Sequence, residues 1–366
     1  MSTSTRVERW RRTAVGGGMH FGRPARVVRT PRQRLSGVID LRTAIVTTVL
    51  FCTAAVLALI ALGVGDYPVP VLRVLAVLLG DGAPRDSLVV LEWRMPRVLL
   101  ALVLGGALGV SGAIFQALTR NPLGSPDVIG FNTGAYTGAL LVILVIGASG
   151  FGATASGAFV GGVVTAAGIY LLAFRRGVQG FRLIIVGIGV SAVLSSVNTW
   201  LVLRGDLQDA MSASMWGAGT LNGATWAQAL PALIAAALLL PAVIGSVRPL
   251  RMLELGDDAA TALGVGTERS RLALILLGVA LTALATSTAG PIAFVALAAP
   301  QLARRLTRAA GASPLSAMAM GSVLLVGSDL VAQRAFAPIQ LPVGVVTASV
   351  GGVYLVWLLV REARRS

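Results

Sequence analysis

Two adjacent acids, Asp257 and Asp258, lie in the one long polar interruption of the C-terminal half of the chain, Arg248 to Arg271. Within it, the stretch from Gly256 to Gly264 has the composition of a short helix, with Asp257 as its cap, alanines in the middle and Gly264 at its end. So short a helix is only marginally stable alone in water, so we expect it to pack against another surface. The chemistry it offers is docking through acids, leucines and flanking arginines. The alternative is an ordinary connecting loop.

Other reactive side chains are scarce. All 30 basic residues are Arg, so the chain lacks the lysine of P-loop ATPases. His20 is the only histidine, and Cys52, the only cysteine, lies in an apolar run where we expect a buried thiol. Neither a metal-binding cluster nor a nucleophile paired with a base is visible. We therefore predict a chain that is not an enzyme and binds no cofactor or metal of its own, so that any transported metal crosses already chelated.

The composition indicates a membrane protein. Of 366 residues, 55% are apolar and 12% charged, with a mean hydropathy of +0.82, whereas soluble domains carry about 25% charged residues. The net charge of +15 comes from arginines in an N-terminal tail and at the ends of apolar runs, without interleaved aromatic residues. This pattern argues against nucleic-acid binding. We predict an all-α polytopic membrane protein.

The apolar runs predict about ten transmembrane helices. Residues 1–42 form an Arg-rich tail predicted to be disordered, and residues 43–366 the transmembrane domain, with an amphipathic piece at Val69–Leu79 expected along the outer surface. The short eighth run leaves open a re-entrant segment and nine spans. The runs are Thr43–Gly63, Val98–Leu118, Phe131–Gly147, Gly152–Phe174, Leu183–Leu203, Ala227–Val247, Leu272–Ala289, Gly290–Ala303, Pro314–Gln333 and Leu341–Val360.

Arginine placement favours ten spans with both termini in the cytoplasm. In that arrangement the inner segments hold 24 arginines and the outer segments hold six. This is the asymmetry expected of cytoplasmic loops. Nine spans would place the basic N- and C-terminal ends on opposite sides. The polar stretch with Asp257 and Asp258 is therefore predicted to be cytoplasmic.

Several polar side chains interrupt the apolar runs. Most such groups form hydrogen bonds between helices, and a place along a transport path is the alternative. Asp329 is the only acid inside a run, about one turn from Gln333, and either a structural hydrogen bond or a proton site is consistent with it. The other polar residues are Gln116, Asn132, Thr133, Ser191, Ser195, Ser196 and Asn198.

Four separated segments, in order, resemble the permease family of ABC importers for iron chelates and cobalamin. They are GALGVSGAIFQALTRNPLGSPDVIGFNTGA (106–135), LELGDDAATALGV, AGPIAFVALAAPQLARRLTR (289–308) and QLPVGVVTASVGGVYLVWLL (340–359). The resemblance extends from about Arg94 to the C-terminus. Within the family, Pro300-Gln301 and Ala332-Gln333 are most similar to the ferric-enterobactin type of permease.

The resemblance implies roles for particular residues. The polar stretch 248–271 would contain the coupling helix that docks in a cleft of the ATPase subunit, and Gln116, Asn121, Asn132 and Thr133 lie in the motif beside the translocation path. The residues assigned to ATPase coupling are Leu253, Leu255, Gly256, Asp257, Asp258, Ala259, Leu263 and Gly264.

The resemblance also implies a docking role for arginines at the outer ends of helices. Arg94 and Arg97 match positions that receive carboxylates from the substrate-binding protein, although arginines at helix ends also extend to lipid headgroups. A third family arginine aligns with Gln333, and whether its neighbour Arg334 takes that role is open. Such charges would mainly set orientation and encounter rate.

The predicted function is therefore the permease subunit of an ATP-driven importer of ferric siderophores in the cytoplasmic membrane. Its expected partners are a paralogous permease, or a second copy, two ATPase subunits that bind ATP and Mg²⁺, and an extracytoplasmic binding protein. The same machinery carrying cobalamin or haem is the nearest alternative. An ion-coupled secondary transporter would need coupling-ion groups near the bilayer midplane, and one acid near an outer end argues against it.

Overall fold

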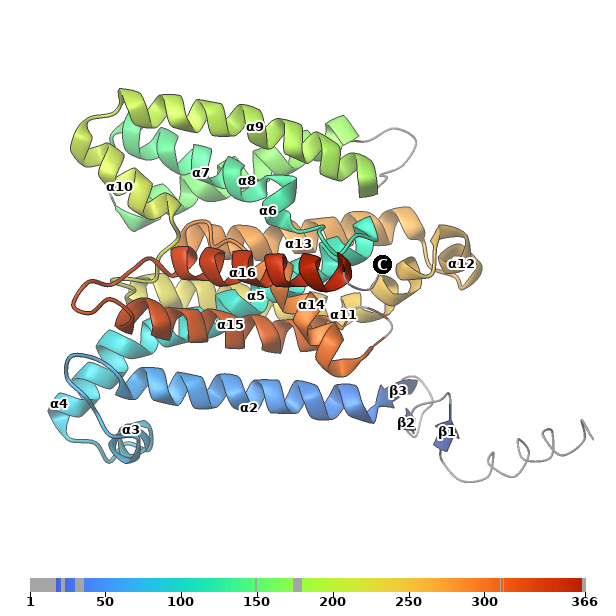
Figure 1. The fold of residues 1–366 in the computed structure, drawn as a ribbon, viewed down its shortest axis with the longest axis horizontal. Helices are drawn as coiled ribbons and strands as arrows, with labels where there is room; N and C mark the ends of the chain where they lie inside the picture. Colours follow the sequence, from blue (N-terminus) through green and yellow to red (C-terminus); the bar gives the residue numbers. More distant parts are fainter. Residues whose placement is uncertain are drawn as a thin grey trace, which may run out of the picture.

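The computed structural model describes residues 18–20, 24–29, 36–148, 150–173, 180–309, 311 and 313–363. Helices make up almost all of the regular structure (Figure 1). In chain order the elements are β1 (Gly18–His20), β2 (Pro24–Arg29), β3 (Ser36–Asp40), α2 (Leu41–Gly63), α3 (Val71–Leu78), α4 (Pro84–Ser87), η1 (Leu88–Arg94, a π-helix), α5 (Met95–Thr119), α6 (Pro126–Ile129), α7 (Phe131–Leu140), η2 (Leu141–Ile146, a π-helix), α8 (Phe151–Ala173), α9 (Gly180–Arg204), α10 (Leu207–Gly217), α11 (Trp226–Glu254), α12 (Asp257–Ala262), α13 (Thr267–Ala289), α14 (Val295–Thr307), α15 (Pro314–Arg334) and α16 (Val343–Ala363).

Seven helical segments of the described chain are long and apolar enough to cross a membrane. They are α2, the continuous segment Pro84–Thr119, α8, α9, α11, α13 and α15, and two shorter apolar stretches, Phe131–Ile146 and Val343–Trp357, accompany them. Their axes run along one common direction (Figure 1). The chain therefore folds into a helical, multi-pass membrane protein, as its composition predicts.

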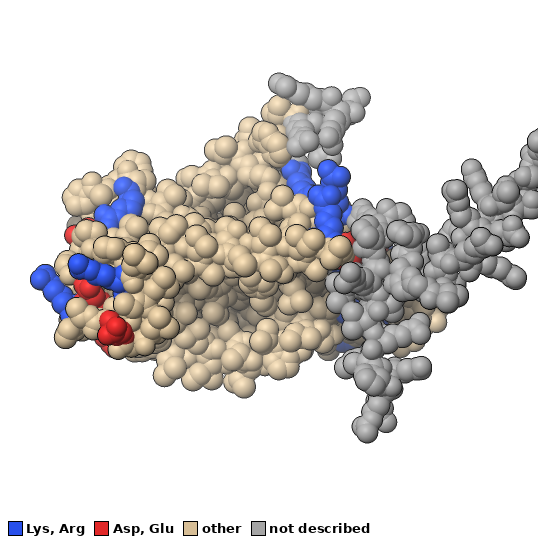
Figure 2. Space-filling model, turned by 90° about the horizontal axis from the view of Figure 1, so that it is seen from below, with Lys and Arg blue, Asp and Glu red and all other residues tan. Residues whose placement is uncertain are grey.

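Charged side chains gather at the two ends of the bundle. Figure 2 shows arginines and acids at one end and arginines at the other, with a wide belt free of charge on the face between them. A charged group is strongly disfavoured in the hydrocarbon core, so this belt is the part that lipid tails can cover. The start of α2, the short helix α12 and the end of α16 all lie at the same end (Figure 1).

Helix α5 is the central helix of the bundle. In its spanning segment 83% of the most apolar window is buried, against 11% for the peripheral helix α9. Gly105 and Gly109 lie against the backbone of α15, where an added Cβ would be 2.4 Å from the Gly321 oxygen and 2.1 Å from the Ala317 oxygen. The two helices approach this closely because only glycine leaves room for the two backbones.

The short eighth run is only partly helical. After α13 ends at Ala289, the chain passes through Gly290 in a left-handed conformation (φ 74°), and α14 begins at Val295 after Phe294, whose φ is 69°. A side chain at position 290 would be 2.3 Å from the Trp216 carbonyl oxygen. The helix covers Val295–Thr307, later than the predicted Gly290–Ala303, and its 13 residues are fewer than the roughly 20 that span a bilayer.

Near the N-terminus the structure differs from the sequence prediction in two places. Three short antiparallel strands, β1 to β3, occur where no strand periodicity was expected, and residues 1–17, 21–23 and 30–35 of the predicted tail lie outside the described residues. Cys52 is exposed on α2 instead of buried. Because α2 is a peripheral helix, it buries a stripe of small side chains such as Ala54, and Cys52 lies off that stripe.

The predicted amphipathic piece near position 70 forms α3. Val74 and Val77 are buried against the bundle, while Leu72 is exposed. The helix packs on α2 and lies beside its C-terminal end (Figure 1). Most of another predicted segment, the inner loop with arginines from 175 to 182, falls on residues 174–179, outside the described residues.

Candidate functional site

The predicted coupling segment forms a short helix, α12, at the end of the bundle (Figure 1). Gly256 (φ 115°) precedes it as the N-cap residue and Gly264 (φ 79°) follows it. The prediction that Asp257 caps this helix is wrong, because its side chain accepts no hydrogen bond from the first turn. The Asp257 carboxylate is instead bound by Arg120 and Arg271, with N···O distances of 3.1 Å and 2.8 Å.

The remaining coupling residues divide into an inner and an outer set. Leu253 and Ala260 are buried in an apolar cluster with residues of α5, α11 and α13. Leu255 and Leu263 are 66% and 56% exposed, and Asp258 is also exposed, while Ala259 is half-buried. Two exposed leucines that flank a short helix beyond the charge-free belt are an apolar surface available to another protein.

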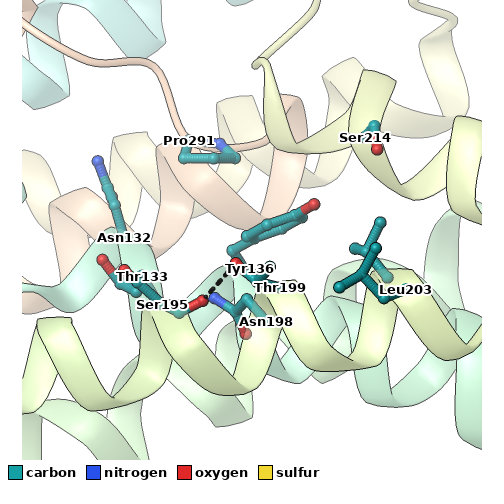
Figure 3. Close-up of a pocket in the computed structure, with 10 residues that line it drawn as sticks. Asn132, Thr133, Tyr136, Ser195, Asn198, Thr199, Leu203, Ser214 and Pro291 are labelled. Carbon is teal, nitrogen blue, oxygen red and sulfur yellow. Dashed lines mark hydrogen bonds between the residues drawn. The ribbon is translucent and has the colours of Figure 1, made fainter.

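A polar cavity of about 460 Å³ lies between α7, α9 and α10. Asn132, Thr133 and Tyr136 of α7 line one side, and Ser195, Asn198 and Thr199 of α9 line the other (Figure 3). The Asn198 amide donates to the Thr133 carbonyl oxygen at 3.4 Å, and its own oxygen has no partner. Val202, Leu203, Ser214 and Pro291 complete the lining, and none of the described lining residues is charged.

The structure brings together two of the four residues predicted for the translocation path. Asn132 and Thr133 line the cavity, whereas Gln116 and Asn121 do not. The Gln116 amide donates to the Leu297 carbonyl oxygen at 2.9 Å and accepts from Arg304, and the Asn121 side chain accepts from the backbone of Leu123. Both therefore serve interhelical and turn hydrogen bonds in this conformation, which is the alternative that the sequence left open.

Asp127 is a polar residue that the sequence analysis did not single out. It lies in α6, inside the Pro- and Gly-rich stretch after α5, where no apolar periodicity marks it as interior. One carboxylate oxygen accepts from the Asn132 amide and the other from the Phe294 backbone N–H at 3.2 Å. Asn132 in turn accepts from Thr286 at 2.8 Å. Asp127 thus joins the cavity wall to the non-helical residues that precede α14.

This placement corrects one step of the sequence argument. Asp127 is a second acid within the helical body, in addition to Asp329, so a scarcity of acids does not by itself argue against ion-coupled transport. Asp329 is 2% exposed near the end of α15 and accepts from Gln333 at 2.8 Å. Of the two roles left open for Asp329, the structural hydrogen bond is the one observed.

The three arginines predicted to dock a binding protein lie near one end of the bundle, but they differ in availability. The Arg97 guanidinium forms a salt bridge with Asp329 at 2.9 Å and donates to the Gln340 side chain at 3.0 Å, with only 12% of its side chain exposed. Arg94 donates to the carbonyl oxygens of Leu62 and Tyr67. Arg334 is 37% exposed and lies 3.6 Å from Asp66, which is 97% exposed.

Among the described residues, no group of three or more His, Cys, Asp or Glu side chains is arranged to hold a metal ion. The site's chemistry is therefore that of hydrogen bonding and ion pairing. A helical bundle with a charge-free belt, an uncharged polar cavity and a short helix presented beyond one end defines the class of membrane-spanning transport subunits.

Within that class, a model of the FecCD transport family matches residues 53–361, and the chain belongs to this family. It is 51% identical over 325 residues to the ferric enterobactin transport system permease protein FepG of Escherichia coli, covering 88% of this chain and 98% of that protein. It is 36% identical over 326 residues to the iron(3+)-hydroxamate import system permease protein FhuG of Bacillus subtilis, covering 87% and 97% of the two chains.

A solved structure supports the same assignment. An inward-facing conformation of a metal-chelate type ABC transporter matches with a TM-score of 0.75 and 26% identity, covering 87% of this chain and 99% of that one. The resemblance predicted from the sequence motifs is confirmed. Members of this family are permease subunits of ABC transporters, which are not themselves enzymes.

Proposed function

We propose that this chain is the membrane permease of an ATP-driven importer that moves ferric siderophores across the cytoplasmic membrane. The observation that carries the proposal is the 51% identity to the ferric enterobactin permease over 98% of that protein's length. Relatives that carry hydroxamate and citrate chelates of iron are 36% and 37% identical. The same machinery carrying cobalamin or haem remains the second candidate for the substrate.

The partners follow from the proposed function. A second permease, a paralogue or another copy of this chain, would complete the path, and two ATPase subunits would bind ATP and Mg²⁺ beneath it. The substrate-binding protein would dock at the opposite end, where Arg334 is the one exposed arginine of the three. ATP and the chelate would each act by preferring one of the outward-open and inward-open states.

The cavity between α7, α9 and α10 is the proposed stretch of the translocation path in this chain. Its lining offers amide and hydroxyl groups and no charge, so it can hydrogen-bond a large chelate without holding it tightly. Asn132 and Thr133 belong to this path in the present conformation. Gln116 and Asn121 would join it only if the segments of α5 and α14 separate.

We propose ten crossings with both termini in the cytoplasm. Two features support this topology: the start of α2 and the end of α16 lie at the same end as α12 (Figure 1), and the segment Gly290–Thr307 returns from the end of α13 towards that end. The extended residues before α14 supply length that its 13 helical residues lack.

The test is uptake by the reconstituted transporter. Proteoliposomes containing this chain, its second permease and the ATPase subunits are supplied with binding protein and radiolabelled ferric enterobactin, with cobalamin and haem as competing substrates. Uptake of the iron chelate that needs ATP and stops with vanadate is expected. Uptake that follows an ion gradient without ATP would contradict the proposal. ATP-driven uptake of cobalamin or haem alone would show that the substrate is the second candidate and not a ferric siderophore.

A further inference from the structure

The coupling segment contains an ion cluster that the proposed function does not explain. The Asp257 carboxylate receives the Arg271 guanidinium on both oxygens, each at 2.8 Å, and the Arg120 guanidinium on one oxygen at 3.1 Å. Arg120 also donates to the Leu253 carbonyl oxygen at 3.3 Å. The three residues belong to three separate parts of the chain, namely the end of α5, the start of α12 and the first turns of α13.

We infer that Asp257 is a positioning residue that clamps α12 to α5 and α13, and that the neighbouring Leu255, Asp258 and Leu263 provide the contact with the ATPase. The inference rests on the proposed function, because it assigns separate tasks to residues of the same coupling segment. The cluster formed by Asp257, Arg120 and Arg271 is called the clamp below.

The need for a clamp follows from the way α12 is attached to its neighbours. Gly256 and Gly264 flank the helix in left-handed conformations, and an added Cβ at either position would meet nothing within 4 Å. Such open glycine joints let a short helix rotate about both of its covalent connections. The buried Ala260 fixes one side of α12, and the clamp fixes a second point, so the two together prevent rotation.

The clamp leads directly to the central helix. Arg120 is the C-cap residue of α5, follows Thr119 without a break and has a left-handed conformation with φ 49°. A non-glycine residue in that region is strained and persists only where its surroundings hold it. A push on α12 can therefore reach α5 through one side chain, without passing along α11 or α13.

Two of the three clamp residues are about half exposed in the free chain. Asp257 is 48% exposed and Arg120 53%, so in the free chain their ion pair contributes little to folding. Arg271 is 16% exposed and holds the other side of the carboxylate. If an ATPase covers α12, water leaves the clamp and its ion pairs become stronger. The clamp would then be firmest when coupling requires it.

The experiment compares Asp257→Asn with Asp258→Asn, a matched pair in adjacent positions of the same helix turn. Each variant of the full chain is assembled with its partners and assayed for ATPase co-purification, ATP hydrolysis and uptake. Asp257→Asn should keep the ATPase bound and hydrolysing, while uptake per ATP falls about fivefold or more, the low end of coupling between two sites. Asp257→Glu should recover most of it, and Asp258→Asn should weaken co-purification.

A second measurement needs no transport and therefore separates this inference from the proposed function. Hydrogen exchange of the α12 amides in the nucleotide-free complex with the ATPase should be faster in Asp257→Asn and Arg120→Gln than in wild type and Asp258→Asn. Equal exchange in all variants, or loss of the ATPase by Asp257→Asn alone, would overturn the inference. If the variants show this exchange pattern but the wild-type transporter imports no ferric siderophore, the proposed function fails and the clamp stands.

Discussion

At the scale of single residues, the same side-chain type performs different tasks according to its partners. Arg97 is held by the buried Asp329, whereas Arg334, at the same end of the bundle, lies 3.6 Å from Asp66, which is 97% exposed. Removing one partner of a buried ion pair leaves an uncompensated charge, while an exposed pair contributes little. A loss of binding-protein docking in an Arg97 variant can therefore come from damage to the fold.

We predict that Arg97→Met alone or Asp329→Leu alone lowers the free energy of unfolding by about 3–5 kcal/mol, the usual penalty for breaking a buried ion pair. The double variant should lie closer to wild type than either single one, because no buried charge is left unpaired. Thermal unfolding in detergent, with Asp66→Ala as the exposed control, measures this. Additive losses in the double variant would show that the pair is not coupled.

At the scale of elements, the long helices are predictable because each contains about 20 apolar residues that face lipid or the bundle interior, and Gly105 and Gly109 mark the close contact of α5 with α15. The break before α14 is only partly predictable. Gly290 and Pro291 indicate where α13 ends, because glycine with positive φ and a following proline stop a helix, whereas the left-handed Phe294 (φ 69°) leaves no signal in the sequence. The pairing of Arg97 with Asp329, 232 residues away, also leaves no local signal.

Asp127 holds the non-helical segment before α14 in place through the Phe294 N–H. We predict that Asp127→Asn makes this segment more mobile. The new amide can accept only through one oxygen, so either the Phe294 N–H or the Asn132 amide loses its acceptor, which costs about 1–3 kcal/mol. Uptake should fall while ATPase binding persists, because α12 lies elsewhere. Thr286→Val, which removes only the other partner of Asn132, is the control and should have a smaller effect. Wild-type thermal stability and uptake in Asp127→Asn would contradict this.

At the scale of the whole molecule, composition and charge are more informative than any motif. The apolar content predicts a lipid-embedded body, and the bundle shows a charge-free belt between two charged ends (Figure 2). The 24 to six division of arginines predicts that the end with α12 faces the cytoplasm. The proposed coupling depends on this topology, because α12 could meet an ATPase only from the cytoplasmic side.

This topology predicts opposite labelling of two engineered positions. In a Cys52→Ser background, which removes the only native thiol, Asp81→Cys lies in the turn after α3 and Asp258→Cys lies in α12; both native aspartates are exposed. A membrane-impermeant maleimide should label the first in intact spheroplasts and the second only after permeabilisation, because the bilayer separates the two ends. Labelling of position 258 from outside would place α12 on the wrong side for any ATPase, and the proposed coupling and the arginine-based orientation would both be wrong.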